Sequence, residues 1–124
     1  MKLSEMWKPA FALAIIAAAT PAMAHHSFAM FDRGEEKTVS GVVAQFAWKN
    51  PHVMLDLETQ DKQGKPTHYR IESASVNILI REGWKVGAVK RGDRVTIVFN
   101  PLKDGRPGGL LVKLVRADGS VLKG

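Results

Sequence analysis

The sequence predicts an all-β protein, a small antiparallel barrel with one short helix, preceded by an N-terminal signal helix. Three observations in the 124-residue chain support this fold class. Several short segments alternate apolar and polar residues, which is typical of strands that bury one face. Beyond the N-terminal region, only residues 73–82 have the spacing of a helix. Glycine, proline and asparagine separate these segments, where hairpins turn.

The first strand is expected over residues 37–48, which are rich in valine, threonine and aromatic residues. Gly41 lies within it and predicts a bulge or a bend. Asn50-Pro51 ends the strand, because proline cannot donate a backbone hydrogen bond.

The second strand is expected over residues 52–59, where the alternation is regular. Its core-facing residues are apolar: Val53, Leu55 and Leu57. Its other face carries His52, Met54, Asp56 and Glu58. Residues 61–66 then form a turn, and residues 67–72 form a third strand that alternates in the same way.

A helix follows the third strand, over residues 73–82. Apolar residues recur there at helical spacing: Val76, Leu79 and Ile80. Ser73 or Ser75 is expected to cap its start, and Gly83 is expected to end it.

Two more long strands are expected over residues 94–99 and 110–117, with a glycine- and proline-rich loop over residues 101–109 and a short strand after Asp118-Gly119. Five strands with a helix between the third and the fourth are typical of the oligonucleotide/oligosaccharide-binding (OB) architecture. Closure into a barrel also protects the strand edges of a small chain. We therefore expect an OB-like five-stranded antiparallel β-barrel, with an open β-meander or a sandwich as the alternative.

Residues 1–24 have the features of a bacterial export signal. The start is basic, residues 9–20 are apolar, and small residues precede the expected cut: Ala22 and Ala24. The apolar run is shorter than the roughly 20 residues that span a bilayer. We expect cleavage after Ala24 and a periplasmic domain over residues 25–124 with no stable membrane span. An uncleaved anchor is the alternative.

The charge distribution and the composition exclude several classes of function. The formal net charge is +6 at pH 7, but lysine and arginine are scattered, which favours a solvated basic surface over a nucleic-acid partner. The lack of cysteine excludes disulfides, thiolate metal sites and cysteine nucleophiles. The sequence contains neither a serine nucleophile elbow nor a phosphate-binding loop, so we expect that the protein is not an enzyme. We also expect it to be a monomer.

The first two histidines carry most of the functional prediction. Cleavage after Ala24 would start the mature chain at His25-His26, which places an α-amine, two imidazoles and a backbone amide close together. Copper(II) favours such nitrogen ligands. His52 is the best distant partner, because it lies at a turn and opposite the apolar stripe of its strand. We therefore predict a copper site at His25, His26 and His52.

Other interpretations of these residues stay open. Histidines next to a cleavage site can simply form a flexible, solvated chain start. His52 can simply fix its turn by hydrogen bonding, and neither role needs a metal. His68 alternates with Arg70 and Glu72, as residues of a solvated face do. Met30 and Met54 would add thioethers, which suit only Cu(I).

Aromatic and polar residues form a second candidate site, because rings on an OB-like sheet can stack a ligand. The set is Phe46, Trp48, Asn50, Tyr69 and Trp84. In so small a domain such rings more often form the core, and Trp84 is expected to plug one end of the barrel.

Several short motifs occur along the chain in a distinctive combination. They are Ala24-His25-His26-Ser27-Phe28, Phe31-Asp32, Gly41-Val42-Val43, Trp48-Lys49-Asn50-Pro51-His52, Gly83-Trp84 and Arg91-Gly92-Asp93-Arg94-Val95. Together they resemble a proteobacterial family of small exported proteins, domain of unknown function family 6152. The resemblance implies a β-barrel and a periplasmic address but no established activity. It supports the metal hypothesis for His25, His26 and His52, whereas His68 falls outside the shared motifs.

Two classes of function follow from these observations. The first is a periplasmic metal-binding protein that carries or delivers copper; an oxidative copper enzyme is less favoured, because a small chain offers little substrate groove. The alternative is a metal-free binding or accessory module, which would hold a periplasmic partner protein or a small ligand on the barrel face or on the loop over residues 101–109. An accessory subunit of a periplasmic oxidoreductase belongs to this second class.

Overall fold

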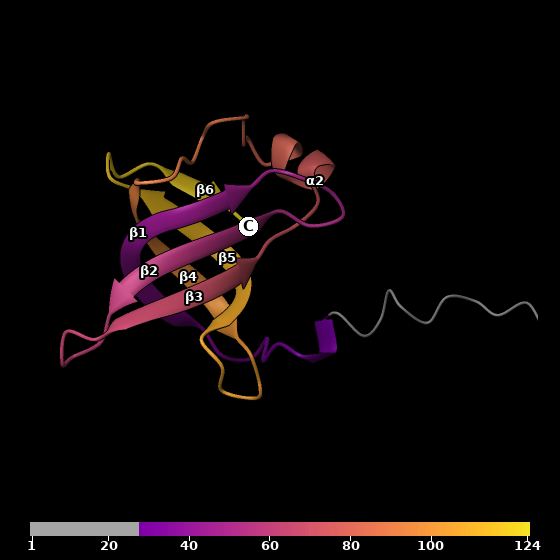
Figure 1. Cartoon of the computed structure of the whole chain (residues 1–124). Helices are drawn as coiled ribbons and strands as arrows, with labels where there is room; N and C mark the ends of the chain where they lie inside the picture. The colour runs from indigo at the N-terminus through magenta and orange to yellow at the C-terminus, as the bar shows by residue number, and fades with distance from the viewer. Residues whose placement is uncertain (1–27) are drawn as a thin grey trace, which may run out of the picture.

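The computed structural model describes residues 28–124, and Figure 1 shows their arrangement. Within this range the chain forms strands and one short helix in the order expected from the sequence. The elements are β1 (Lys37–Ala47), β2 (Met54–Gln60), β3 (Pro66–Glu72), α2 (Val76–Arg81), β4 (Arg94–Pro101), β5 (Gly108–Arg116) and β6 (Val121–Lys123). The predicted signal and its cleavage site lie outside the described residues.

The sheet closes on itself, which confirms the predicted barrel. Its strand order is β3-β2-β1-β4-β5-β6, and β3 also pairs with β5. In this closing pair Arg70 lies opposite Gly108, and Glu72 lies opposite Leu110. The closing pair is parallel, whereas the other pairs are antiparallel. This closed arrangement of β1 to β5, with α2 between β3 and β4, has the OB order and excludes the open meander and the sandwich.

Glycine allows neighbouring strands to approach closely at two places in the barrel. A Cβ at Gly109 would collide with the backbone oxygen of Asn100, next to the closing pair. A Cβ at Gly41 would collide with the backbone oxygen of Glu58 on β2. The predicted bulge is displaced from Gly41, because the register of β1 against β2 shifts between Val43 and Gln45. Gly41 therefore serves strand contact, and the irregularity follows it.

The core lies inside the barrel and follows the alternation of the sequence. The three core-facing residues of the second predicted strand are at most 2% exposed: Val53, Leu55 and Leu57. This strand begins at Met54, two residues later than predicted. Val53 instead accepts a hydrogen bond from Ser73 N–H and donates one to Ala74 O. His52 therefore precedes β2 and lies in the turn.

The same exchange delays the helix. Because Ser73 and Ala74 still pair with Val53, α2 starts at Val76 and not at residue 73. Ser75 occupies the cap position, but its side chain makes no capping hydrogen bond. The cap comes from the distant turn, where Asn50 Oδ1 accepts the Val76 N–H at 3.1 Å.

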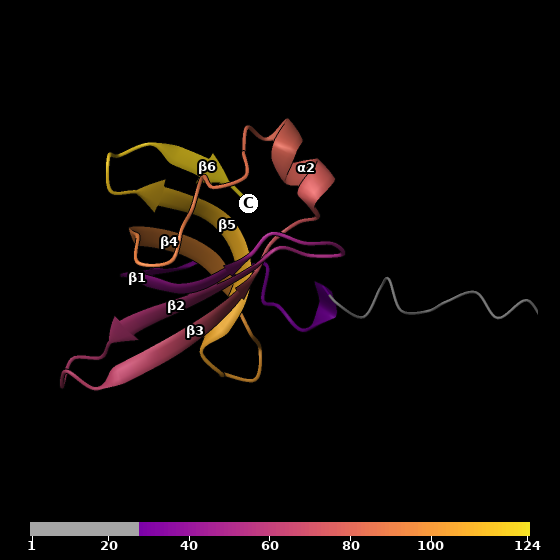
Figure 2. The ribbon, with the colours of Figure 1, turned by 45° about the horizontal axis from the view of Figure 1, so that its top comes forward.

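The helix packs only one apolar residue tightly into the core. Leu79 is fully buried, whereas Ile80 is 54% exposed, so the predicted apolar stripe is wrong at Ile80. The predicted stop is confirmed: Gly83 has a positive φ of 93° and donates its N–H to Ile80 O. Figure 2 shows this short helix at the end of the curved sheet, near β6.

Three rings form a cluster beside α2, which we call the aromatic cluster: Phe46, Trp48 and Trp84. Their centroids lie 6.0–6.4 Å apart. Trp84 is 2% exposed and donates its Nε1–H to Lys123 O at 2.6 Å. The core interpretation of these rings is therefore confirmed, most clearly for Trp84. Tyr69 packs edge-on against Phe99, with ring centroids 5.7 Å apart.

Candidate metal-binding site

Residues 28–36 form an N-terminal arm that is fixed to the barrel. Phe31 is 4% exposed and forms a β-bridge with Leu102, at the end of β4. Asp32 N–H donates to Pro101 O at 2.8 Å, and Lys103 N–H donates to Met30 O at 2.9 Å. The arm therefore follows one defined path along the barrel, and Figure 1 shows it in indigo beside the β4–β5 loop.

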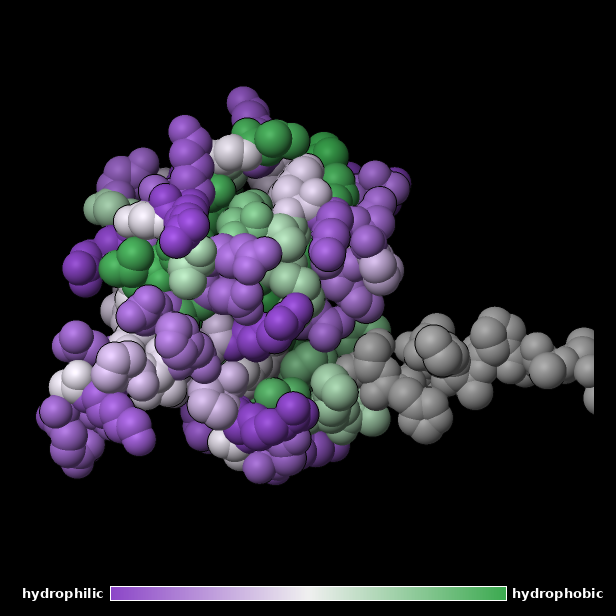
Figure 3. Space-filling view, in the orientation of Figure 1, coloured by the Kyte–Doolittle hydropathy of each residue, from purple (hydrophilic) through white to green (hydrophobic). Residues whose placement is uncertain are grey.

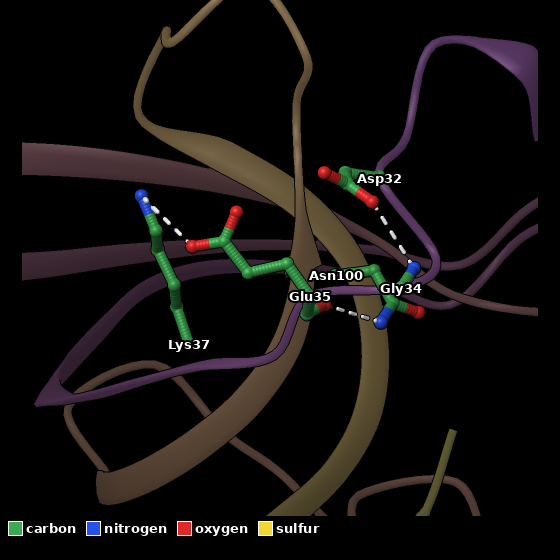
Figure 4. A network of polar contacts seen from close by, with 5 residues as sticks. All are labelled: Asp32, Gly34, Glu35, Lys37 and Asn100. Carbon is green, nitrogen blue, oxygen red and sulfur yellow. Dashed lines mark hydrogen bonds and ion pairs between the residues drawn. The ribbon is translucent and has the colours of Figure 1, made fainter.

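Polar contacts hold the second half of the arm (Figure 4). Asn100 is 8% exposed and donates its side-chain N–H to Glu35 O at 2.8 Å. Asp32 Oδ1 accepts the Gly34 N–H at 3.1 Å and shapes the turn. The exposed pair between Lys37 and Glu35, at 3.9 Å, adds little because solvent screens it. The buried amide of Asn100 is thus the main polar anchor.

His52 pairs with a carboxylate from the neighbouring strand. Its Nδ1 lies 3.0 Å from Glu72 Oε1, and the two side chains are 35% and 19% exposed. Glu72 lies opposite Met54 in the register of β2 and β3, just beyond the turn that carries His52. The carboxylate can accept a hydrogen bond from Nδ1–H, and in the neutral ring with its proton on Nδ1 the lone pair lies on Nε2. His52 is therefore oriented as metal-binding histidines commonly are.

A pocket of about 370 Å³ lies between the arm and Glu72. We call it the methionine pocket, because Met30 from the arm and Met54 from β2 both line it. Its other lining residues are Phe31, Arg70, Glu72, Leu102, Arg106, Pro107 and Gly109. Glu72 thus contacts both His52 and the pocket. A larger hollow of about 670 Å³ near Phe46 and Lys90 contains no histidine, methionine or carboxylate among its lining residues.

The charges around the methionine pocket are mixed. Arg106 Nε pairs with Asp104 Oδ2 at 2.7 Å. The Arg106 backbone N–H and then its guanidinium lower the pKa of Asp104, because both donate hydrogen bonds to the carboxylate. Among the ion pairs of residues 28–124, none involves Arg70. The positive charge of Arg70 therefore opposes a bound cation more than that of Arg106 does.

The predicted copper ligands differ in what the structure describes of them. His25 and His26 lie outside the described residues, so their convergence with His52 stays a prediction. His68 is exposed on β3 opposite Glu58, and it lines a different hollow from the methionine pocket. No three His, Cys, Asp or Glu side chains between residues 28 and 124 form a metal-binding group.

Two features of the site escape a prediction from sequence. From the sequence, Glu72 is expected to be one more solvated residue of an alternating strand. The position of the hairpin turn could nevertheless have predicted that it lies opposite Met54. The docking of the arm has only a weak signal, the short apolar run of residues 28–31 ahead of the mostly charged residues 32–36. In the described part of the chain, no helix is long and apolar enough to cross a membrane.

The fold and the site define a small closed β-barrel with an N-terminal arm laid against it. The chain matches the Family of unknown function (DUF6152) over residues 13–113, and it belongs to that family. No curated protein matches it. Among solved structures it is similar to the mitochondrial single-stranded DNA binding protein Rim1 from S. cerevisiae. The TM-score is 0.50 at 12% identity, over 72% of this chain and 94% of that one, so the likeness concerns the fold alone.

Proposed function

We propose that this protein is exported, is cleaved after Ala24, and binds copper in the periplasm through its new N-terminus, for carriage or delivery. The α-amine and ring of His25, the imidazole of His26 and Nε2 of His52 would supply the ligands. Amine and imidazole nitrogens suit tetragonal Cu(II).

The observation that carries the proposal is the shared pocket of the arm and Glu72. Met30 is docked on the barrel and lines the same pocket as Glu72, which holds His52. His26 precedes Met30 by four residues. Because residues 28–29 are helical, the chain from His26 to Met30 spans at most about 10 Å. The docked arm therefore limits how far His26 can lie from the pocket that Glu72 lines, which a free chain end would approach only at an entropic cost.

The His52–Glu72 pair supports the same role. A metal-binding histidine usually gives its second N–H to a carboxylate, which fixes the ring and makes the other nitrogen more basic. The 3.0 Å contact of Nδ1 with Glu72 has this geometry. The exposed His68 provides an internal comparison, because it is a histidine of the same barrel that forms none of the ion pairs seen in residues 28–124.

The decisive experiment is a Cu(II) titration, by competition with a chelator, of two forms of the protein. One begins at His25, and the other carries one extra glycine before His25. We expect the added residue to lower the affinity for Cu(II) by at least about tenfold, because it removes the α-amine from the ligand set. His52→Ala should also lower the affinity, and His68→Ala should not. Equal affinity in the two forms would overturn the amino-terminal site.

A metal-free binding role is the second candidate, and an exposed apolar surface favours it. Ile78 and Ile80 on α2 are 49% and 54% exposed, and Val86 is 79% exposed. Figure 3 shows apolar surface over α2. If this role dominates, a strain lacking the protein should be rescued by His25→Ala and His52→Ala variants but not by an Ile78→Ser/Ile80→Ser variant.

A further inference from the structure

We propose that the methionine pocket is a second metal subsite, which binds Cu(I) through the thioethers of Met30 and Met54. It deepens the copper function proposed above and rests on it for the identity of the metal. The N-terminal nitrogens would serve Cu(II), and the sulfur atoms of the methionine pocket would serve the reduced ion.

The placement of the methionines carries this inference. The chain has five methionines, and residues 28–124 contain two of them, Met30 and Met54. They are 24 positions apart in sequence, on the arm and on β2, and both line the same pocket. The fold has thus brought together every thioether of the described residues.

Ordinary core packing does not account for both side chains. Methionine commonly fills irregular gaps in a core. Met30, however, is 45% exposed, while its backbone is held by the bond from Lys103 N–H to Met30 O. The next residue, Phe31, supplies the buried anchor of the arm. Met30 is therefore positioned by its neighbours while its side chain faces solvent and the pocket.

The chemistry of the pocket suits a soft monovalent cation. Thioethers are soft ligands that select Cu(I), whereas hard divalent ions prefer oxygen. Glu72 also lines the pocket and contributes one negative charge to it. Arg70 lines the same pocket and opposes a cation, so two neutral sulfur atoms alone would bind weakly. We therefore expect Arg70→Gln to raise the affinity for Cu(I).

The test uses Ag(I), a redox-inert analogue of Cu(I), and Cu(I) itself under anaerobic reducing conditions. We expect Met30→Leu and Met54→Leu each to lower the affinity for both ions by at least about tenfold, since leucine keeps the volume and removes the sulfur. His68→Ala is the matched control and should leave the affinity unchanged. Unchanged affinity in the Met30→Leu/Met54→Leu double variant would overturn the inference.

A measurement on the unaltered protein guards against a variant that fails to fold. With carbon-13 labels on the methionine methyl groups, Ag(I) should shift the resonances of Met30 and Met54 together and saturate at one equivalent. Resonances that stay in place would refute the subsite.

The two copper proposals fail separately. An extra residue before His25 should weaken Cu(II) binding and leave Ag(I) binding intact. The double methionine variant should show the reverse. Loss of only one of these two effects would remove only the corresponding site.

Discussion

The aromatic cluster and the methionine pocket are both built from residues that are distant in sequence, yet the first is packed around a buried ring and the second contains an open space. In the aromatic cluster, Phe46 and Trp84 are stacked with centroids 6.0 Å apart, and Trp84 is 2% exposed. In the methionine pocket, about 370 Å³ stays open and Met30 is 45% exposed. The rings pack on one another around the buried Trp84, whereas the arm and the barrel leave a hollow that both methionines line. The first region therefore stabilises the fold, and the second is available for a ligand.

The polar groups beside the two regions also differ in how many of their hydrogen-bonding atoms already have a partner. The only N–H of the Trp84 side chain is used by Lys123 O, so the ring has no polar group left to offer. His52 has two ring nitrogens, and the contact with Glu72 occupies only Nδ1. A satisfied polar group anchors a side chain, and a half-used one can bind a ligand.

The largest expected effect is on the aromatic cluster. Trp84→Ala should lower the free energy of unfolding by about 3–5 kcal/mol, because it removes a buried ring and leaves a cavity. Urea denaturation measures the loss, and the folded fraction should still bind Ag(I). Val86→Ala, at a side chain that is 79% exposed, is the control and should change stability little. If Trp84→Ala lowered the free energy of unfolding as little as Val86→Ala, the assignment of the aromatic cluster to the stabilising core would be contradicted.

The intermediate effect is on the metal site. Glu72→Gln should lower the affinity for Cu(II) by about 10–100-fold, because the amide no longer holds the His52 ring through a charged hydrogen-bond acceptor. The free energy of unfolding should change far less than in Trp84→Ala. Glu58→Gln is a matched control, since Glu58 lies opposite the exposed His68. Equal affinities for Cu(II) in the two variants would argue against a metal-orienting role for Glu72.

The smallest effect concerns the turn that links the two regions. Asn50→Ala should lower the free energy of unfolding by about 1 kcal/mol, because the Val76 N–H loses its acceptor at the start of α2. Asn50→Asp keeps an acceptor oxygen and should retain most of the stability. Thermal melts followed by circular dichroism compare the two variants with the unaltered protein. Equal losses in both variants would show that the cap is not the reason.

The barrel could be predicted from the sequence, because its information is local. The alternation of Val53, Leu55 and Leu57 assigns each side chain to a face, and a slip by one residue would expose all three. The helical spacing after β3 and the end of the helix at Gly83 likewise depend only on residues that are close in sequence. The exact helix start was not predictable, because Asn50, from a distant turn, provides the cap.

The candidate site could be predicted only in part. His52 is a candidate ligand because the sequence puts it at a turn, and the structure places it just before β2, beside Glu72. Glu72 and the docked arm could not be predicted, because a carboxylate in an alternating strand and a short apolar run near the chain start have the same appearance whether or not they meet a partner. The pairing of Met30 with Met54 was likewise beyond reach, since nothing in the sequence sets the path of the arm.

The sequence by itself determined the strand faces, the order of the elements, the membership in the family and which residues are candidate soft and nitrogen ligands. Only the tertiary structure decided which of these ligands are neighbours. The physical reason is that periodicity reports how each segment meets the core, whereas the contact of Glu72 with His52 and the shared pocket of Met30 and Met54 depend on barrel closure and on the anchoring of Phe31.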